Sequence, residues 1–305
     1  MLAVKIVLTV LGALIILYLL LIMPRMFGRP DRKPHLGVLY AHRGLFDNKG
    51  DAPENSMKAF ERAVHAGYGI ELDVQTTKDG IPVVFHDFTL KRMARYPDGE
   101  CPADAQRAED GSYIIPGRIC DYTWEELSRF HLLDTGERIP RFDEFLRLVR
   151  GQVPLIVELK IELKDLTVCR KAQELLDDYD GVYCIESFNP LGLWWYRRKR
   201  PEVMRGQLAD SFRKSEGWHA PLYYILEFLL MNILAKPDFI AYNHKYRRNL
   251  SRVLCTKLYG ALPVAWTIRS EQDLAENSRY FDIMIFDSFV PDHTGISLQT
   301  QNTVG

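Results

Sequence analysis

Carboxylate, imidazole and basic side chains recur in or just after short apolar runs of this 305-residue chain. The set comprises His42, Arg43, Glu71, Asp73, His86, Glu158 and Lys160. Glu71 and Asp73 are two residues apart, and so are Glu158 and Lys160, a spacing that places both side chains of a pair on one face of a β-strand. If the runs are strands of one sheet, three carboxylates converge with two imidazoles, a guanidinium and an ammonium.

This combination of groups favours metal-assisted chemistry on a phosphate. Glu71 and Asp73 would repel each other and resist ionisation unless a cation lay between them. Oxygen-only ligands suit Mg²⁺ or Ca²⁺, and Glu158 would be the third ligand. Arg43 offers a planar fork for a phosphate and Lys160 a point charge. The two imidazoles titrate near neutral pH and suit proton transfer.

A purely structural interpretation competes for each pair taken alone. Glu158 and Lys160 could form a salt bridge inside the fold, and Glu71 could pair with Arg43. A histidine at the end of a strand is most often structural. The convergence of the whole set nevertheless favours the chemical interpretation.

The elements that must position these groups are predicted from hydrophobic patterning. Nine runs have the character of strands: 38–41, 70–74, 81–86, 154–160, 182–187, 204–209, 238–242, 263–268 and 282–287. Helical patterning is found at 55–66, 123–129, 141–149 and 166–176. The second and third strands are too close in sequence for a parallel crossover and must form a hairpin. The other eight, in about 250 residues, predict a (β/α)₈ TIM barrel, whose active site lies at the C-terminal ends of its strands.

The start of the chain departs from this pattern. Residues 6–23 run without a charge, and a helix of that length spans about 27 Å, enough for a bilayer core. A cleaved signal peptide is the competing interpretation, but its apolar region is usually shorter and ends at small residues. We therefore predict a transmembrane anchor at 1–23, a linker at 24–37 and a barrel domain at 38–305.

The charges that flank the apolar segment predict its orientation. Arg25, Arg29, Arg32 and Lys33 follow it, whereas only Lys5 and the α-amine precede it. This asymmetry predicts a single-pass protein of the cell membrane with its barrel in the cytoplasm. Five widely spaced cysteines without a CxxC pair agree with a reducing compartment. The formal net charge of -1 gives no indication of nucleic-acid binding.

Several short motifs resemble the glycerophosphodiester phosphodiesterase family. They are His42-Arg43-Gly44, Pro53-Glu54-Asn55-Ser56, Ala59-Phe60, Ile70-Glu71-Leu72-Asp73-Val74, Thr77-Lys78-Asp79-Gly80, Val83-Val84-Phe85-His86-Asp87, Ile139-Pro140, Val157-Glu158-Leu159-Lys160, Ser187-Phe188 and Ala265-Trp266-Thr267. The resemblance covers nearly everything after the linker, and the block from His42 to Asp87 is its most specific part.

The resemblance implies a role for each site residue. It implies His42 and His86 as the acid/base pair, Glu71, Asp73 and Glu158 as metal ligands, Arg43 and Lys160 at the phosphate, and Trp266 in the substrate pocket. It also implies a route in which a glycerol hydroxyl attacks the adjacent phosphorus and water opens the cyclic phosphate. Three positions depart from the family pattern. Ser56 replaces a threonine and keeps a helix-capping hydroxyl, whereas Arg269 and Phe286 are expected to alter the pocket rather than the chemistry.

The first hypothesis for function is therefore hydrolysis of glycerophosphodiesters at the membrane surface. A lysophospholipase D acting on lysophospholipids is the alternative, and it would need an apolar groove facing the anchor. A silent, membrane-tethered binding protein is less favoured, because every expected polar position is filled. The apolar stretch 222–235 is expected to be a helix packed on the barrel or an interfacial segment. The sequence does not distinguish Mg²⁺ from Ca²⁺ and carries no signal for a protein partner.

Overall fold

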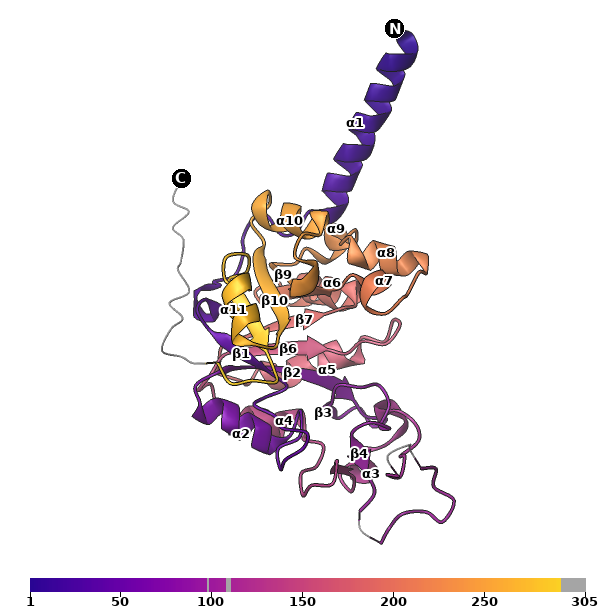
Figure 1. Cartoon of the computed structure of the whole chain (residues 1–305), viewed down its shortest axis with the longest axis vertical. Coiled ribbons are helices and arrows are strands. Elements are labelled where there is room, and N and C mark those ends of the chain that lie inside the picture. The colour runs from indigo at the N-terminus through magenta and orange to yellow at the C-terminus, as the bar shows by residue number, and fades with distance from the viewer. Residues whose placement is uncertain (98, 108–110, 292–305) are drawn as a thin grey trace.

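The computed structural model describes residues 1–97, 99–107 and 111–291. A long helix projects from a barrel, and a smaller layer lies against the barrel on the side away from that helix (Figure 1). Residues 292–305 of the predicted barrel domain lie outside the described residues.

Eight parallel strands close into a ring, which confirms the predicted (β/α)₈ barrel. In chain order they are β1 (Leu39–His42), β2 (Gly69–Thr76), β6 (Leu155–Leu159), β7 (Tyr183–Ser187), β8 (Arg205–Ala209), β9 (Phe239–Asn243), β10 (Leu262–Ile268) and β11 (Ile283–Phe286). The ring closes at β1, where Ala41 pairs with Ile70 of β2 and with Phe286 of β11. The strands are apolar along most of their length because helices cover their outer faces and side chains fill the interior.

The predicted hairpin is present beside β2. The strand β3 (Pro82–Val84) runs antiparallel to β2, with Val74 opposite Val84. Thr77 makes the turn, since its backbone N–H donates to the Ile81 carbonyl and its hydroxyl accepts from the Ile81 N–H. The hairpin brings the chain back to the C-terminal end of β2, which carries His86 to the carboxylates.

Helices surround the ring. They are α2 (Met57–His65), α4 (Phe142–Val149), α5 (Thr167–Leu176), α6 (Pro190–Lys199), α7 (Phe212–Ser215), α8 (Pro221–Glu227), α9 (Asn232–Ala235), α10 (Leu250–Lys257) and α11 (Glu271–Asn277). The hydroxyl of Ser56 accepts from the Ala59 N–H at 3.1 Å at the start of α2, so the serine caps as expected. Phe60 of α2 packs edge-to-face on Phe145 of α4, with ring centroids 4.5 Å apart.

The stretch 222–235 is not the single amphipathic helix expected from its sequence. It divides into α8 and α9, and Leu229 between them adopts a left-handed backbone with φ 58°. Glu227 and Asn232 are both buried and hydrogen-bonded. Five residues along one straight helix would place them about 140° apart. The break lets both side chains reach polar partners inside the protein.

A small second core extends from the active-site end of β3. It contains α3 (Trp124–Leu127) and the short strands β4 (Ala94–Arg95) and β5 (His131–Leu132). The 3-10 turn η2 (Ile119–Asp121) belongs to the same layer. Leu90, Met93, Ile115 and Phe130 are among the side chains that pack there.

The N-terminal helix α1 (Leu2–Ile22) is the one helix among the described residues that is long and apolar enough to cross a bilayer, a test that a signal sequence also passes. Its last turn packs on the barrel. The Ile22 carbonyl accepts from Asn232 Nδ2 at 3.0 Å, and the Leu19 carbonyl accepts from the Tyr259 hydroxyl at 3.0 Å.

The predicted linker 24–37, which contains the 3-10 turn η1 (Lys33–His35), is bonded to the barrel at several points. The Arg25 N–H donates to the Pro237 carbonyl at 3.0 Å. Arg29 Nη1 donates to the Gly260 carbonyl at 2.7 Å. These bonds hold the segment along the end of the barrel where the strands begin.

Candidate active site

Three carboxylates meet at the C-terminal ends of β2 and β6. One oxygen from each of Glu71, Asp73 and Glu158 lies within 4.8 Å of the others, and all three side chains are buried. Asp73 and Glu158 are direct neighbours in the parallel register of the two strands. The alternation that the sequence predicted for these strands therefore brings the three groups together.

The electrostatics of the cluster reflect crowding of like charges in a buried place. Burial, and then the neighbouring charges of Asp73 and Glu186, raise the pKa of Glu71 well above its ordinary value. Burial also raises the pKa of Glu158 to about 7, although Lys160 acts against the shift. Burial acts in the same direction on Asp73, but Lys160 and other cations outweigh it and keep the Asp73 pKa well below its ordinary value.

Lys160 contacts two of the carboxylates. Its Nζ lies 2.9 Å from Glu158 Oε1 and 3.3 Å from Asp73 Oδ1. The salt bridge considered for Glu158 and Lys160 is therefore present, and it lies within the carboxylate cluster rather than apart from it.

The cluster fits a hard divalent cation. Asp73 Oδ1 is buried and accepts no hydrogen bond, although its ion pair with Lys160 lies at 3.3 Å, and Oε2 of Glu186 on β7 is buried without a hydrogen-bond partner. Glu186 lies beside Glu158 in the strand register. Oxygen-only donors with unmet acceptor capacity suit Mg²⁺ or Ca²⁺. Sequence analysis did not select Glu186, although the alternation of the run 182–187 could have indicated it.

Arg43 is held among these groups by a second set of ion pairs. Its Nη1 lies 2.7 Å from Glu54 Oε1, and its Nε lies 3.5 Å from Asp73 Oδ2. The expected alternative pairing with Glu71 is wrong for the guanidinium, because Glu71 Oε2 instead accepts from the Arg43 backbone N–H at 3.2 Å. The pairing of Arg43 with Glu71 was expected from their charges alone. Charge does not indicate whether the side chain or the backbone of Arg43 faces the carboxylate.

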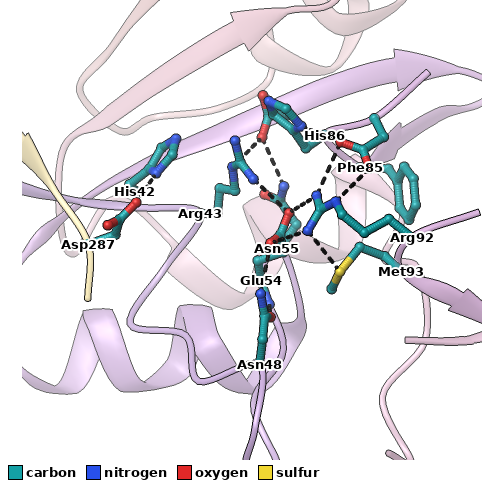
Figure 2. Close-up of polar contacts among 12 residues, drawn as sticks. His42, Arg43, Asn48, Glu54, Asn55, Phe85, His86, Arg92, Met93 and Asp287 are labelled. Carbon is teal, nitrogen blue, oxygen red and sulfur yellow. Dashed lines mark hydrogen bonds and ion pairs between the residues drawn. The ribbon is translucent and has the colours of Figure 1, made fainter. Parts of the chain in front are cut away.

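Glu54 and Arg92 support this arrangement and were not selected from the sequence. Arg92 Nη2 lies 2.6 Å from Glu54 Oε1, and Arg92 Nε lies 2.7 Å from Asp87 Oδ2. Burial alone would raise the pKa of Glu54, but hydrogen bonds and charge from Arg92 and Arg43 lower it to about 2. Glu54 therefore stays ionised. Its carboxylate contacts both guanidinium groups, as Figure 2 shows.

The two histidines lie on either side of Arg43 (Figure 2), and a carboxylate orients each of them. His42 Nδ1 lies 2.8 Å from Asp287 Oδ2, and His86 Nδ1 lies 2.6 Å from Asp87 Oδ1. Burial lowers the pKa of His42 to about 4 and also lowers that of His86, while the carboxylates act in the opposite direction. Each imidazole is thus neutral at pH 7, with Nδ1 engaged and Nε2 available as a proton acceptor.

Asp287 connects one of the departures from the family pattern to this pair. Arg269 Nε donates to Asp287 Oδ1 at 3.0 Å. Position 269 therefore lies two contacts from His42, closer to the chemistry than the sequence comparison indicated.

Trp266 of β10 lies half-buried near the end of its strand and packs edge-to-face on Phe188, with ring centroids 5.6 Å apart. Its indole Nε1 is buried without a hydrogen-bond partner. Phe188 follows β7, so the two rings form an aromatic surface at the same end of the barrel as the carboxylates.

Comparison with known proteins agrees with this geometry. The model of the glycerophosphoryl diester phosphodiesterase family matches residues 42–296. A glycerophosphodiester phosphodiesterase of Bacillus altitudinis is 36% identical over 131 residues, which cover 41% of this chain and 44% of that protein. One of Caldanaerobacter subterraneus subsp. tengcongensis is 32% identical over 197 residues, covering 61% and 71% respectively.

Solved structures share the fold. An Oleispira antarctica phosphodiesterase in complex with the product sn-glycerol-3-phosphate has a TM-score of 0.61 at 24% identity, covering 83% of this chain and 93% of that one. A glycerophosphodiester phosphodiesterase of Thermotoga maritima has a TM-score of 0.58 at 21% identity, covering 83% and 96% respectively. Because the family model matches more than half of the sequence, the chain belongs to the glycerophosphoryl diester phosphodiesterase family.

Proposed function

We propose that this chain hydrolyses glycerophosphodiesters to an alcohol and glycerol phosphate. Membership of the family supports the reaction class. The observation that carries the proposal is the buried cluster of Glu71, Asp73 and Glu158, flanked by two histidines that carboxylates orient. A purely structural ion-pair network does not need two neutral imidazoles held in fixed tautomers.

Different residues of the chain have different roles in the proposed reaction. One of His42 and His86 accepts the proton of the attacking hydroxyl at Nε2. The other first takes up a proton from solvent at its Nε2 and then delivers that proton to the leaving oxygen. Arg43 and Lys160 provide positive charge for the phosphate. Glu71, Asp73 and Glu158 would hold a divalent ion, which when bound offsets charge on a phosphate oxygen.

The sequence is also compatible with two other functions. A lysophospholipase D would need an apolar groove facing the anchor, yet the cavity beside α1 among the described residues carries five basic side chains. A silent binding protein is disfavoured because every catalytic position of the family is occupied. The soluble glycerophosphodiester is therefore the preferred substrate class.

We further propose that α1 anchors the enzyme in a bilayer with its barrel on the cytoplasmic side. Mean hydropathy of 2.7 and the exposure of nearly all of the helix support the anchor. The excess of basic residues after the helix supports the orientation.

The test is an assay of the full-length protein in detergent with glycerophosphocholine, glycerophosphoethanolamine and lysophosphatidylcholine. We expect release of the head-group alcohol from the first two, its loss in EDTA, and its recovery with Mg²⁺ or Ca²⁺. His42→Ala, Glu71→Ala and His86→Ala should each abolish turnover in a folded protein. Wild-type activity in any of these variants would remove the role proposed for that residue.

A further inference from the structure

A cavity of about 420 Å³ lies on the rim of the barrel, outside the carboxylate cluster. It is formed by α7, α8, the 3-10 turn η3 (His244–Tyr246) and the start of α10. These segments follow β8 and β9, so the cavity belongs to the same end of the barrel as the active site. Its charged lining residues are Arg213, Lys214, Glu227, Lys245, Arg247 and Arg248.

The lining carries strong positive charge. Five cations and one carboxylate give a formal charge of +4 (5 − 1) in a chain whose total is -1. Glu227 is already engaged, because its oxygens accept from Arg213 Nε and Nη2 at 3.0 and 2.9 Å. Within the part of the chain that the structure describes, the other four cations form no salt bridge. Such a concave cluster of unpaired cations attracts a phosphate-bearing anion.

The helix α10, whose first residue Leu250 lines the cavity, lies near the foot of α1 (Figure 1). Tyr246 lines the cavity and packs in the same cluster as Tyr18 and Leu19 of α1. The hydroxyl of Tyr18 lies 2.7 Å from that of Ser251, the residue after the lining residue Leu250. The cavity and the last turn of α1 are therefore neighbouring parts of one surface.

The length of α1 places this surface at the membrane. Residues 2–17 lie almost entirely free of the barrel, and they span only about 24 Å, whereas a bilayer core is about 30 Å thick. The last turn must also enter the bilayer, and it is bonded to α9, α10 and the residue Tyr259. The barrel surface around that turn is thereby drawn to the headgroup region.

Apolar side chains on this surface fit the same location. Trp218, Leu222, Tyr224, Ile233, Leu250 and Leu258 are all exposed to solvent. They lie on or beside α8, α9 and α10, and Leu250 also lines the cationic cavity. Exposed apolar groups interleaved with unpaired cations match an anionic lipid surface.

We propose that this cavity binds the phosphate of an anionic phospholipid in the bilayer that holds α1. The proposal rests on the membrane anchoring proposed above. A phospholipid seated there joins the rim of the active-site end to the membrane at a second point, so the barrel cannot swing freely about α1. The double variant K245Q/R248Q removes two of the unpaired cations without touching the catalytic residues.

The experiment presents the full-length protein in detergent with equimolar phosphatidylglycerol and phosphatidylcholine of identical acyl chains. Native mass spectrometry then measures which lipid is retained. We expect the wild type to retain phosphatidylglycerol about tenfold over phosphatidylcholine, and K245Q/R248Q to lose most of that preference. The control R170Q/K171Q, on α5 against β2 and β3, should retain it.

Absence of the preference in the wild type, or its persistence in K245Q/R248Q, would overturn the proposal. Displacement of the lipid by millimolar glycerol phosphate would also overturn it, because the cavity would then serve a soluble phosphate. The measured mass shows whether α1 is still attached, so a cleaved leader is recognised directly. Turnover of glycerophosphocholine is recorded in parallel, and its absence in the wild type would count against the proposed hydrolysis alone.

Discussion

The two histidines of the site obtain their orientation in different ways. His86 bonds the side chain of the next residue, Asp87, whereas His42 bonds Asp287, which lies 245 residues further along the chain. A carboxylate on Nδ1 fixes the tautomer that presents Nε2 to the substrate. The orientation of His42 therefore depends on the pairing of β11 with β1.

Asp287→Asn should lower kcat by about 100-fold or more with a smaller change in KM, because an amide facing Nδ1 favours the wrong tautomer. Initial rates with glycerophosphocholine measure both constants. Asp177→Asn, which alters an exposed ion pair with Arg200, serves as the matched control and should behave as the wild type. Equal kcat values in the two variants would show that Asp287 does not position the histidine.

Divalent metal should stabilise the domain, and more so at pH 8 than at pH 5. The pKa of Glu158 is raised to about 7, so this carboxyl is largely protonated at pH 5, and the pKa of Glu71 is raised in the same direction. A metal must displace these protons when it binds. At 100 times its Kd the metal adds about 2.7 kcal/mol, or roughly 5 to 10 °C in Tm. Thermal unfolding with and without Mg²⁺ or Ca²⁺ measures the shift.

In the metal-free protein, the carboxyls of the cluster should contribute the opposite trend of stability with pH. Raised carboxyl pKa values contribute stability that is present below the unfolded value of 4.5 and is lost as the pH rises through the folded value, about 7 for Glu158. Glu158→Gln should remove most of the metal-induced rise in Tm. An undiminished rise in this variant would place the bound metal elsewhere.

The candidate site was predictable to the extent that it is local in sequence. The carboxylates of β2 and β6 and the two histidines follow from strand alternation and from the ends of strands. Apart from Asp87, which follows His86 directly, their partners do not, because His42 meets Asp287 and Arg92 meets Glu54 only through the closed fold. A formal charge identifies an ion-pairing group but does not indicate which of many opposite charges it will contact.

At the scale of elements, the strands and the hairpin were predicted because their signals are short-range. Apolar runs of strand length, and a turn too short for a crossover, exclude most other arrangements. The break between α8 and α9 was not predictable, since it depends on two buried polar side chains whose partners come from elsewhere. Glu227 accepts from the Ser211 hydroxyl, and Asn232 donates to the end of α1.

The turn η1 connects the segment 24–37 to the barrel through a buried histidine. His35 Nδ1 lies 2.7 Å from the hydroxyl of Tyr40 on β1, and burial lowers the His35 pKa from 6.5 to about 4. The folded state therefore favours neutral His35, whereas the unfolded chain takes up a proton below pH 6.5. This contribution to stability is complete above the unfolded pKa and is lost as the pH falls towards the folded pKa.

Between pH 7 and pH 5 this histidine should reduce the free energy of unfolding by roughly 2 kcal/mol. His35→Gln removes the titrating imidazole and should reduce the change in the free energy of unfolding between pH 7 and pH 5 by that amount. His65→Gln, an exposed site at the end of α2, is the matched control and should leave it unchanged. Urea unfolding of the full chain in detergent at the two pH values gives the comparison. If His35→Gln does not alter the difference in the free energy of unfolding between the two pH values, other groups cause that difference.

At the scale of the whole molecule, the basic residues after α1 have two roles. Arg25 and Arg29 bond backbone carbonyls at the end of the barrel where the strands begin, so they hold α1 in a fixed position on the domain. The same charges determine the predicted orientation, since basic flanks remain in the cytoplasm. A helix fixed in this way transmits the orientation of the anchor to the barrel, so under the proposed anchoring the rim near α8 and α10 is expected to face the inner leaflet.

Native cysteines can report this orientation without any substitution. Cys120 is exposed on the second core, whereas Cys169, Cys184 and Cys255 are buried. A membrane-impermeant maleimide should therefore leave the full chain unlabelled in intact cells and label it in inside-out vesicles. Cys120→Ser should lose most of the labelling, because the half-buried Cys101 reacts more slowly. Labelling in intact cells would reverse the orientation and place the barrel, with its active site, on the outer face of the membrane.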